Sequence, residues 1–397
     1  MRFPEFSGEW KCTTIGNIGD IKNGPFGSVL HAEDYVENGI PIVTTEHFKT
    51  GLMPSDKFGI PQVSNEDYIR LKGYRLETND IVFSRVGSVD INAHVGIEQN
   101  GWLFSGRVLR VRPKYDIDSL FLHYALSTEA VKRDIRNRAV GQTMPSINTP
   151  ILSSTTIQLP KDLFEQKKVA HFLRLLDERI ITQNKIIEDL KKLKSAIVDY
   201  IFNNEVLSFR KRIHLSDVAT KITQKNTNNH VSNVLSNSAN QGIIPQSEVF
   251  DREIANEDNT SNYFVISQND FVYNPRKSAT APYGPINRYN GQTYGVISPL
   301  YLCFRSHNID VEYLGWYFKS DSWHKYVYQN GDTGVRHDRV SIKDEFFFSM
   351  PLFIHNADEQ IEIAKRLNKI ESFVKQEEQY LFLLESQKLY LLQQMFI

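Results

Sequence analysis

Apolar residues recur along two long stretches of this chain with the alternating four-residue and three-residue spacing of a heptad repeat. In the first stretch the seam positions are Val169, Leu173, Leu176, Ile180, Gln183, Ile187, Leu190, Lys194, Ile197 and Ile201. In the second stretch they are Ile363, Leu367, Ile370, Val374, Glu377, Leu381, Leu384, Lys388, Leu391 and Met395. The pattern predicts two long helices, over residues 161–204 and 357–397, that pair with one another.

Polar residues interrupt both seams at the same two places, where Gln183 matches Glu377 and Lys194 matches Lys388. A polar residue in a coiled-coil seam costs stability, but it can fix the register and the orientation of the partner helix. The matched positions therefore favour a pairing of these two helices with each other.

A capping box is expected at the start of each helix, because Asp162 precedes Glu165 by three residues and Asn356 precedes Glu359 by three. Apolar residues outside the seam widen the apolar face of both helices. They are Phe172, Ile186, Leu193, Tyr200, Phe382, Leu383, Leu389 and Tyr390. This width predicts that each helix packs against a second partner as well as its sister.

An internal repeat organises the whole chain. Residue n resembles residue n+194 across the two helices without a gap, and the segment NDIVFSR (79–85) resembles NDFVYNP (269–275) at a slightly smaller offset. The different offsets indicate loops of different length on one scaffold. The chain is therefore predicted to be one unit written twice, each copy being a globular block followed by a long helix.

Both globular blocks, residues 1–160 and 205–356, alternate short Val/Ile/Phe/Tyr runs with Gly, Pro and Asn. This pattern is typical of strands and turns. We expect each block to be mostly β, with one helix near its end at 117–138 and 309–329. The fold class is then α+β, with two tandem mostly-β domains that are each followed by a long helix as an internal duplication.

Composition excludes several classes of protein. The 397 residues include 46 Lys plus Arg and 47 Asp plus Glu, so the chain lacks the basic excess of a lone nucleic-acid binder. Its two cysteines, Cys12 and Cys303, have no zinc or disulfide spacing around them. No apolar run is long enough to span a membrane, and the amino end lacks a signal-peptide pattern. A cytoplasmic protein without metal is expected.

Catalytic motifs are missing from the chain. Asp162, Glu165 and Lys167 resemble a metal-dependent nuclease pattern, but helix capping explains the acids and Ile361 replaces the lysine in the second copy. No glycine precedes a lysine, so the chain has no nucleotide phosphate loop. The segment NPRK (274–277) lacks the second proline and the aromatic residue of the amino-methyltransferase motif. The chain is therefore predicted to be non-catalytic.

Polar loops are the expected working parts of both blocks. In the first block they are IKNGPFGS (21–28), TTEHF (44–48), FSRVGS (83–88) and RDIRNRAVGQTMPSIN (133–148). In the second they are SNVLSNSANQG (232–242), YNPRKSAT (273–280) and NGDTGVRHDRVS (330–341). Basic residues beside a glycine turn, with amide and hydroxyl donors, suit contacts to phosphates and base edges.

The order of these segments resembles one family. RFPEFSGEW, NGPFGSVLHAEDYVENGIPIVTTEHF, NDIVFSR, GQTMPSIN, SNSANQGIIPQ, DFVYNP and GVISPLYLCF together resemble the specificity subunits of type I restriction-modification systems. The resemblance implies that each block is a target recognition domain for one half of a bipartite, asymmetric double-stranded DNA site. The two helices would pair as an antiparallel coiled coil with pseudo-twofold symmetry and form the spacer between the two domains.

The same resemblance implies partners and cofactors. Two adenine methyltransferase subunits would dock on this chain and bring S-adenosylmethionine, and restriction subunits can join them with ATP and Mg. The chain itself would hold no cofactor.

DNA-contacting residues are assigned from their positions in the matched loops. In the first block they are Lys22, Asn23, Ser28, Thr44, Thr45, Glu46, Arg85, Arg136, Arg138, Gln142, Thr143 and Ser146. In the second they are Asn237, Asn240, Gln241, Asn274, Arg276, Lys277, Arg336, His337 and Arg339.

The sequence also leaves two other interpretations open. A coiled-coil scaffold whose blocks bind a protein or a carbohydrate would assemble through the same helices without any effect on DNA. A self-sufficient nuclease or methyltransferase would need the motifs that are missing, so it is the least favoured of the three.

Overall fold

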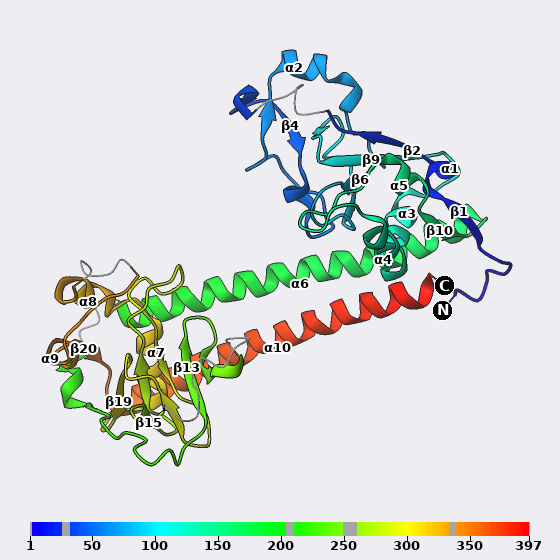
Figure 1. Ribbon diagram of the computed structural model, residues 1–397. Coiled ribbons are helices and arrows are strands. Elements are labelled where there is room, and N and C mark those ends of the chain that lie inside the picture. The colour runs from blue at the N-terminus through cyan, green and yellow to red at the C-terminus, as the bar shows by residue number, and fades with distance from the viewer. Residues whose placement is uncertain (1, 26–31, 204–209, 249–259, 333–337, 397) are drawn as a thin grey trace. The chain divides into compact units, whose positions relative to one another are not determined.

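The computed structural model describes residues 2–25, 32–203, 210–248, 260–332 and 338–396. Its contacts divide the chain into two compact units (Figure 1). Unit 1 consists of Met1–Asn184 with Gln379–Ile397, and unit 2 of Lys185–Glu378. Among the described residues, no helix combines the length and the apolar character needed to cross a membrane.

Unit 1 contains two four-stranded sheets. One has the order β2 (Gly19–Asn23), β9 (Val108–Pro113), β6 (Ile81–Ser84), β7 (Asn92–His94), and the other β3 (Tyr35–Val36), β5 (Gln62–Val63), β4 (Ile40–Val43), β8 (Leu103–Phe104). A separate strand pair is formed by β1 (Lys11–Thr14) and β10 (Thr156–Leu159). The helices are α1 (Ile15–Ile18), α2 (Asn65–Arg70), α3 (Ser119–Leu126), α4 (Glu129–Arg138) and α5 (Thr149–Ser153).

The sheet β2-β9-β6-β7 lies between two cores. Successive side chains on a strand point to opposite faces. Accordingly, Ile81 and Phe83 of β6 pack among the residues of α1, α3, α4 and α5. Val82 between them packs with Val43 and Phe104 of the second sheet. Unit 1 therefore has three layers, with helices on one face of the central sheet and a second sheet on the other.

Unit 2 repeats this plan. Its central sheet is β12 (Ala219–Lys221), β19 (Leu302–Ser306), β16 (Phe271–Tyr273), β17 (Ile286–Arg288), and its second sheet β14 (Gly242–Pro245), β13 (Val234–Ser238), β18 (Gly295–Ile297), β15 (Phe264–Ile266). The strand pair is β11 (Lys211–His214) with β20 (Pro351–Ile354), and the helices are α7 (Val311–Lys319), α8 (His324–Asn330) and α9 (Asp344–Phe348). The predicted duplication and α+β class are confirmed.

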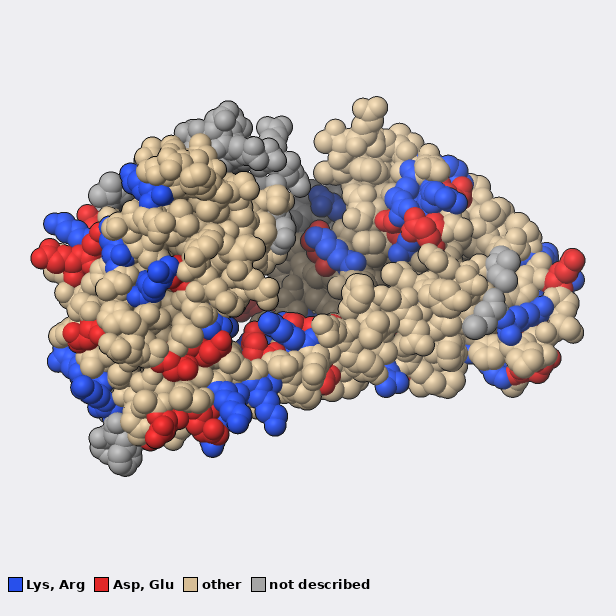
Figure 2. Space-filling view, turned by 90° about the horizontal axis from the view of Figure 1, so that it is seen from below, with Lys and Arg blue, Asp and Glu red and all other residues tan. Residues whose placement is uncertain are grey.

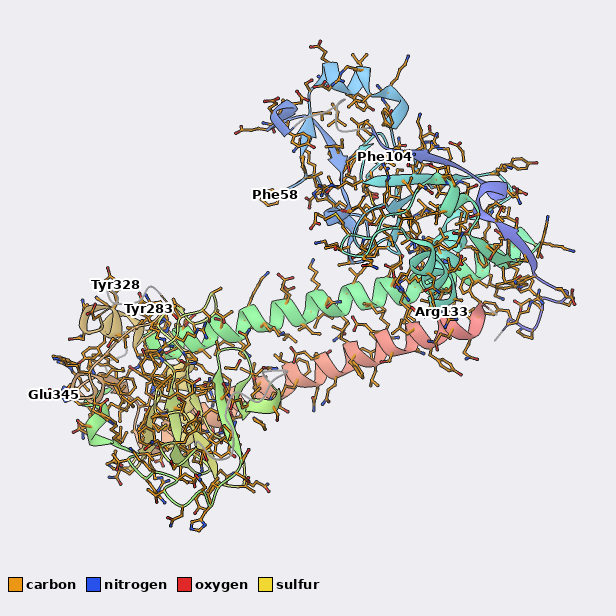
Figure 3. All side chains as sticks on the ribbon, in the orientation of Figure 1. Phe58, Phe104, Arg133, Tyr283, Tyr328 and Glu345 are labelled. Atoms are coloured by element: carbon orange, nitrogen blue, oxygen red, sulfur yellow. The ribbon has the colours of Figure 1, made fainter. Side chains whose placement is uncertain are left out.

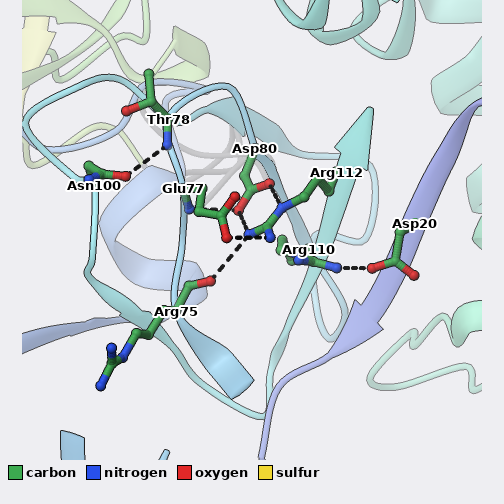
Figure 4. Close-up of polar contacts among 8 residues, drawn as sticks. All are labelled: Asp20, Arg75, Glu77, Thr78, Asp80, Asn100, Arg110 and Arg112. Carbon is green, nitrogen blue, oxygen red and sulfur yellow. Dashed lines mark hydrogen bonds and ion pairs between the residues drawn. The ribbon is translucent and has the colours of Figure 1, made fainter. Parts of the chain in front are cut away.

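The same ion pair braces the central sheet of each unit. In unit 1 the guanidinium of Arg112 donates to both oxygens of Asp80, at 2.7 and 2.8 Å (Figure 4). In unit 2 Arg305 binds Asp270 at the same two distances. The asparagine before each aspartate has φ +74°, a conformation that asparagine tolerates better than most residues. The repeated Asn-Asp turn therefore has a structural role in both copies.

The expected helices at 117–138 and 309–329 are each two helices, so that prediction is wrong in detail. In the first, the hydroxyl of Thr128 donates to the carbonyl of Ala125 and interrupts the ladder between α3 and α4. In the second, the hydroxyl of Ser320 donates to the carbonyl of Tyr317 at the end of α7. Serine and threonine hydroxyls compete with backbone donors in this way and favour helix ends.

The two heptad stretches form helices α6 (Leu163–Asn203) and α10 (Ala357–Met395), and every predicted seam position is buried or half-buried. In unit 1 the start of α6, with Leu173, shares a core with Leu391 from the end of α10. In unit 2 the end of α6, with Phe202, shares a core with Leu367 from the start of α10. The helices are therefore antiparallel within each unit, as predicted.

Each polar lysine of the seam pairs with an acid of the other helix. Lys388 lies 2.5 Å from Asp177 in unit 1, and Lys194 lies 2.6 Å from Glu371 in unit 2. The two acids occupy matching positions in the two copies. Although partial burial opposes ionisation, the hydrogen bond from Lys194 and the neighbouring lysines lower the pKa of Glu371. The matched pairs fix the antiparallel register.

Only the second predicted capping box is complete. There Glu359 donates its backbone N–H to Asn356, and its carboxylate accepts from the backbone of Asn356. At the first helix Asp162 caps the backbone of Phe164, but Glu165 does not reach back. Its buried carboxylate instead binds the guanidinium of Arg2 at 2.7 Å and the indole N–H of Trp10. The expectation for Glu165 is wrong because a charged donor from the amino-terminal segment binds it more strongly than a backbone amide.

The Arg112→Ala substitution should lower the free energy of unfolding of unit 1 by about 3 kcal/mol, because it leaves the buried Asp80 carboxylate without its charged partner. Hydrogen exchange should show faster exchange of β6 and β9 amides, while β16 and β19 keep their rates. Arg70→Ala is the control, since it breaks a surface pair with Asp67 and should cost less than about 1 kcal/mol. Equal effects of the two substitutions would contradict this role of Arg112.

Candidate nucleic-acid interface

Three of the predicted loops of unit 1 meet at one end of its two sheets. In the central sheet Asn23 pairs with Leu109 and Ser84 pairs with Val108, so the loops after β2 and β6 leave from the same edge. The second sheet places the end of β4 beside the end of β8, and the N–H of Ser105 donates to the carbonyl of Val43. The segments near residues 23, 44 and 85 are therefore neighbours around the turn at 105–107.

Gly24 shows how closely these loops approach one another. A Cβ atom on Gly24 would lie 1.9 Å from the carbonyl oxygen of Ser105, so only glycine fits there. The guanidinium of Arg85 donates to the carbonyl of Gly106 at 3.1 Å from the other side. The small residues around the turn let three loops share a compact base.

The fourth predicted loop, near residues 140–148, joins this cluster through two backbone hydrogen bonds. Ile147 donates to the carbonyl of Arg85 at 2.9 Å, and Gly87 donates to the carbonyl of Pro145 at 2.8 Å. We call these two contacts the loop bonds. They hold the segment at 141–146 beside the loop that follows β6.

Unit 2 contains the same loop bonds. Val340 donates to the carbonyl of Pro275 at 2.9 Å, and Lys277 donates to the carbonyl of Asp338 at 2.8 Å. An isolated β-bridge joins Val86 to Ser146 in unit 1 and Arg276 to Arg339 in unit 2. The backbone arrangement is thus repeated while the side chains at the bridge differ.

Asn237 organises the loops of unit 2 from inside. Its side chain is 2% exposed and donates to the carbonyl of Val272 at 2.7 Å. It also accepts from Asn287 at 2.7 Å, and its backbone carbonyl accepts from the side chain of Asn274. Both predicted DNA-contacting asparagines, Asn237 and Asn274, therefore hold the base of the loops together, and a direct contact to DNA through either stays a prediction.

The remaining predicted residues differ in the solvent exposure of their side chains. Exposed side chains are those of Glu46, Gln142, Thr143, Asn240, Gln241 and Arg276. Half-buried ones are those of Lys22, Asn23, Thr44, Thr45, Arg85, Ser146, Lys277 and Arg339. Ser28, Arg336 and His337 lie outside the described residues. The exposed and half-buried sets lie on the converging loops of their own unit, and their contacts to DNA stay predictions.

Two predicted arginines are engaged within unit 1. Arg136 pairs with Asp90 and Glu129, and its hydrogen bonds with these acids raise its pKa. Arg138 donates to Ser154 and Thr155 and pairs with Asp134. Both arginines thereby fasten α4 to its surroundings. Arg133 of the same helix is exposed and forms no ion pair with any described residue (Figure 3).

Sequence reasoning missed other candidates on the same loops. Arg107 is exposed at the turn that joins the sheets of unit 1 and forms no ion pair with the described residues. In unit 2, Tyr283 lies beside Tyr328 of α8, with ring centroids 6.4 Å apart, and Tyr328 is largely exposed (Figure 3). The signal for Arg107 was the small-residue turn Ser-Gly-Arg between two β runs. No comparable signal marks Tyr328, whose segment has an ordinary helical pattern.

Charges of both signs are interleaved on the protein surface. On the face drawn in Figure 2, basic and acidic side chains lie next to one another over both units, in keeping with a net charge of −1. A broad basic surface of the kind that binds DNA without sequence preference is not seen on this face.

Part of the chain matches known sequences of one kind. Residues 7–192 match the type I restriction modification DNA specificity domain. Over 210 residues the chain is 25% identical to the type I restriction enzyme MjaVIII specificity subunit of Methanocaldococcus jannaschii, covering 51% of this chain and 47% of that one. A MjaX specificity subunit of the same organism is 31% identical over 219 residues, 52% of this chain and 49% of the relative. The chain spans about half the length of the curated relatives it matches.

Solved structures extend the likeness to the whole fold. The S subunit of the type I restriction-modification system of M. genitalium covers 100% of this chain and 99% of its own length, with a TM-score of 0.57 and 15% identity. A chain solved to explain complex assembly and conformational transition of the type I R-M system gives 0.61 and 13%, with 98% of both chains covered. Residues 7–192 therefore match a type I restriction modification DNA specificity domain, and the chain has the fold of the M. genitalium S subunit over its full length.

Proposed function

We propose that this chain reads a bipartite DNA site, one half with each unit, and holds methyltransferase subunits on its paired helices. The observation that carries this proposal is the repetition of the loop bonds. The same backbone contacts hold Ile147 and Val340 in place, but the bridge beside them carries Val86 and Ser146 in one unit and Arg276 and Arg339 in the other. A constant scaffold with different side chains suits two different half-sites.

Base readout follows from the chemistry of the exposed loops. Arginine can form two hydrogen bonds with guanine, asparagine or glutamine can do so with adenine, and a glutamate accepts from the cytosine amino group. Unit 1 offers Glu46 and Gln142, and unit 2 offers Asn240, Gln241 and Arg276. Each good pair of hydrogen bonds is worth about 1–3 kcal/mol of discrimination against a wrong base.

The paired helices have an outer surface suited to partner subunits. A groove of about 410 Å³ runs between α6 and α10 in unit 2, lined by Leu190, Leu193, Ile197, Ile370 and Phe373 with Arg366 and Lys369 beside them. Leu193 and Phe373 are 56% and 47% exposed, although large apolar residues are normally covered. We assign this groove to a methyltransferase subunit.

The partners would also supply the chemistry and the missing positive charge. S-adenosylmethionine would bind the methyltransferase subunits, and ATP and Mg would come with restriction subunits where these join. Basic surface on the partners would neutralise the DNA phosphates that this nearly neutral chain leaves uncompensated. The chain itself would contribute recognition and spacing without a catalytic step.

Sequencing of methylated bases provides the direct test of this function. A host that expresses the chain with its methyltransferase partners should carry adenine methylation at one bipartite motif, and deletion of the chain should remove it. A host that lacks any related specificity chain is required, so that no other subunit restores the mark. Methylation that persists unchanged at every bipartite motif would reject the proposal in favour of a scaffold role.

The loop bonds allow each half-site to be tested separately. Ile147→Pro and Val340→Pro each remove one backbone donor, which should loosen the loops of one unit and weaken binding about tenfold or more through lost base contacts. We expect Ile147→Pro to relax one half of the methylated motif and Val340→Pro the other.

Ile147→Ala and Val340→Ala are the matched controls, because they keep the N–H and remove only side-chain packing. Circular dichroism establishes that each variant is folded. If one proline substitution relaxed both half-sites while its alanine control relaxed neither, independent reading by the two units would be excluded.

Spacing of the half-sites should depend on helix length. Deletion of residues 184–190 and 378–384 together removes one heptad from each helix, and Glu385 then replaces Glu378 as the partner of Lys191. The recognised spacing should shorten by about 10 Å, or roughly three base pairs. Deletion of 184–190 alone is the control and should disturb pairing of the seams. An unchanged spacing in the double deletion would show that the helices do not set the distance.

A further inference from the structure

Unit 2 contains a polar cavity of about 650 Å³ that the base-reading proposal does not use. The tip of the β13–β14 hairpin forms one wall with Asn240 and Gln241, and helix α7 forms another with Gly315 and Lys319. Residues of α6 and α10 within unit 2 complete the lining. The volume lies within the range of about 300–1,000 Å³ that is usual for ligand sites. We call this cavity the lysine pocket.

Positive charge exceeds negative charge in the lysine pocket. Its ionisable lining consists of Lys194, Arg288, Lys319, Lys375, Glu312 and Glu371. Lys194 pairs with Glu371 and Arg288 pairs with Glu312, each at 2.6 Å. Lys319 and Lys375 form no ion pair with any residue that the structure describes. Two positive charges therefore remain uncompensated at one place in a chain whose total charge is −1.

The residues around Lys319 affect its charge state and its position. Its Nζ atom lies 4.2 Å from the centre of the Trp316 ring. Lys319 is exposed at one side, but desolvation by the surrounding lining lowers its pKa, and the charges of Lys194, Lys375 and Arg288 lower it further, while Glu371 opposes them. An anion bound beside Lys319 would relieve the repulsion among these cations.

Unit 1 fills the corresponding place. Helices α3 and α7 correspond, and each begins at an aspartate cap, Asp118 in α3 and Asp310 in α7. Counted from these caps, His123 corresponds to Gly315 and Ser127 corresponds to Lys319. The imidazole of His123 is buried and lies 2.7 Å from the side-chain oxygen of Asn92. A Cβ atom added to Gly315 would meet no atom within 4 Å. The open space and the lysine are thus specific departures of unit 2 from the duplicated plan.

The lysine pocket adjoins the loops that are proposed to read DNA. Asn240, in the wall of the pocket, accepts a hydrogen bond of 2.9 Å from the hydroxyl of Thr280 in the loop after β16. The loop turns back at Gly284, where a Cβ atom would lie 2.0 Å from the carbonyl oxygen of Asn274. Loop and hairpin tip therefore form one rim, so a DNA strand on the loops would pass the mouth of the pocket.

We propose that the lysine pocket binds one phosphate group of the DNA backbone beside the half-site that unit 2 reads. Lys319 and Lys375 would neutralise the phosphate, and the amides of Asn240 and Gln241 would donate hydrogen bonds to its oxygens. Such a contact fixes the position of the duplex without selecting a base. This inference rests on the proposed DNA-reading function and adds a phosphate site that unit 1 lacks at the matching place.

The test is the salt dependence of DNA binding by the complete complex with its methyltransferase subunits. Lys319→Ser introduces the residue of unit 1 and should reduce the slope of log affinity against log salt by about 0.9, on cognate and unrelated duplexes alike. The methylated motif should stay the same. Lys211→Ser is the matched control, because Lys211 is an exposed lysine of β11 without an ion pair among the described residues, and it should leave the slope at the wild-type value.

Gly315→His provides a second variant, since it should fill the pocket as His123 fills the place in unit 1. It should reduce the slope as Lys319→Ser does, and a melting curve shows that the variant is folded. Unchanged slopes in both variants would overturn the DNA phosphate site while leaving the proposed function intact, because the wild-type complex still selects its motif. Failure of the wild-type complex to select any motif would instead reject the proposed function.

Inorganic phosphate distinguishes a DNA phosphate from a soluble one. Calorimetric titration of phosphate into the complex without DNA should give weak binding to the wild type and a further loss with Lys319→Ser. If this binding disappears in the variant while the salt slope stays unchanged, the pocket takes a soluble phosphate compound and the DNA assignment is wrong.

Discussion

Burial of the long-helix ends is the constraint on which the rest of the structure depends. The end of α10 brings Phe396 against Trp10 and Phe121 in the core of unit 1. The end of α6 brings Phe202 against Tyr313 and Tyr317 in the core of unit 2. The core of unit 1 is therefore completed by the carboxyl-terminal end of α10, and the core of unit 2 by the carboxyl-terminal end of α6. A change of length in one helix alone would remove one of these aromatic residues from its core or shift the lysine–acid pairs between the helices out of register.

Side-chain ion pairs between the helices fix the helix register, whereas the loop bonds, which are backbone hydrogen bonds, fix the position of the loops. Register along the helices needs specific charges, and Lys388 with Asp177 and Lys194 with Glu371 supply them at matching places. Position of the loops needs only backbone N–H and C=O groups. Every residue has the C=O acceptor, and every residue except proline has the N–H donor. Side chains at the loop tips are thereby free to differ between the units while the loops keep their geometry. This division suits the proposed reading of two different half-sites.

Periodicity made the helices predictable, because a heptad pattern depends only on nearby residues. The duplication was predictable because a constant offset of 194 residues is visible in the sequence itself. Every predicted seam position is covered, and both copies of the Asn-Asp turn carry the same ion pair. Long-range contacts were not predictable in this way. Glu165 binds Arg2, and Arg136 binds Asp90, because the fold brings together segments that have no shared local pattern. The helix ends near Thr128 and Ser320 depend on hydrogen bonds from their hydroxyl groups. The pattern of apolar residues continues past these positions and therefore did not predict the ends.

Departures from the repeat carry more functional information than the repeat itself. Where both units retain a contact, as at Asp80 and Asp270, folding alone accounts for it. Where unit 2 replaces a packed His123 with Gly315, packing is lost, and a buried ring normally contributes more than an empty space. A lysine that replaces Ser127 at the edge of that space adds charge where the duplicate has none. The ligand proposed for unit 2 alone accounts for both changes.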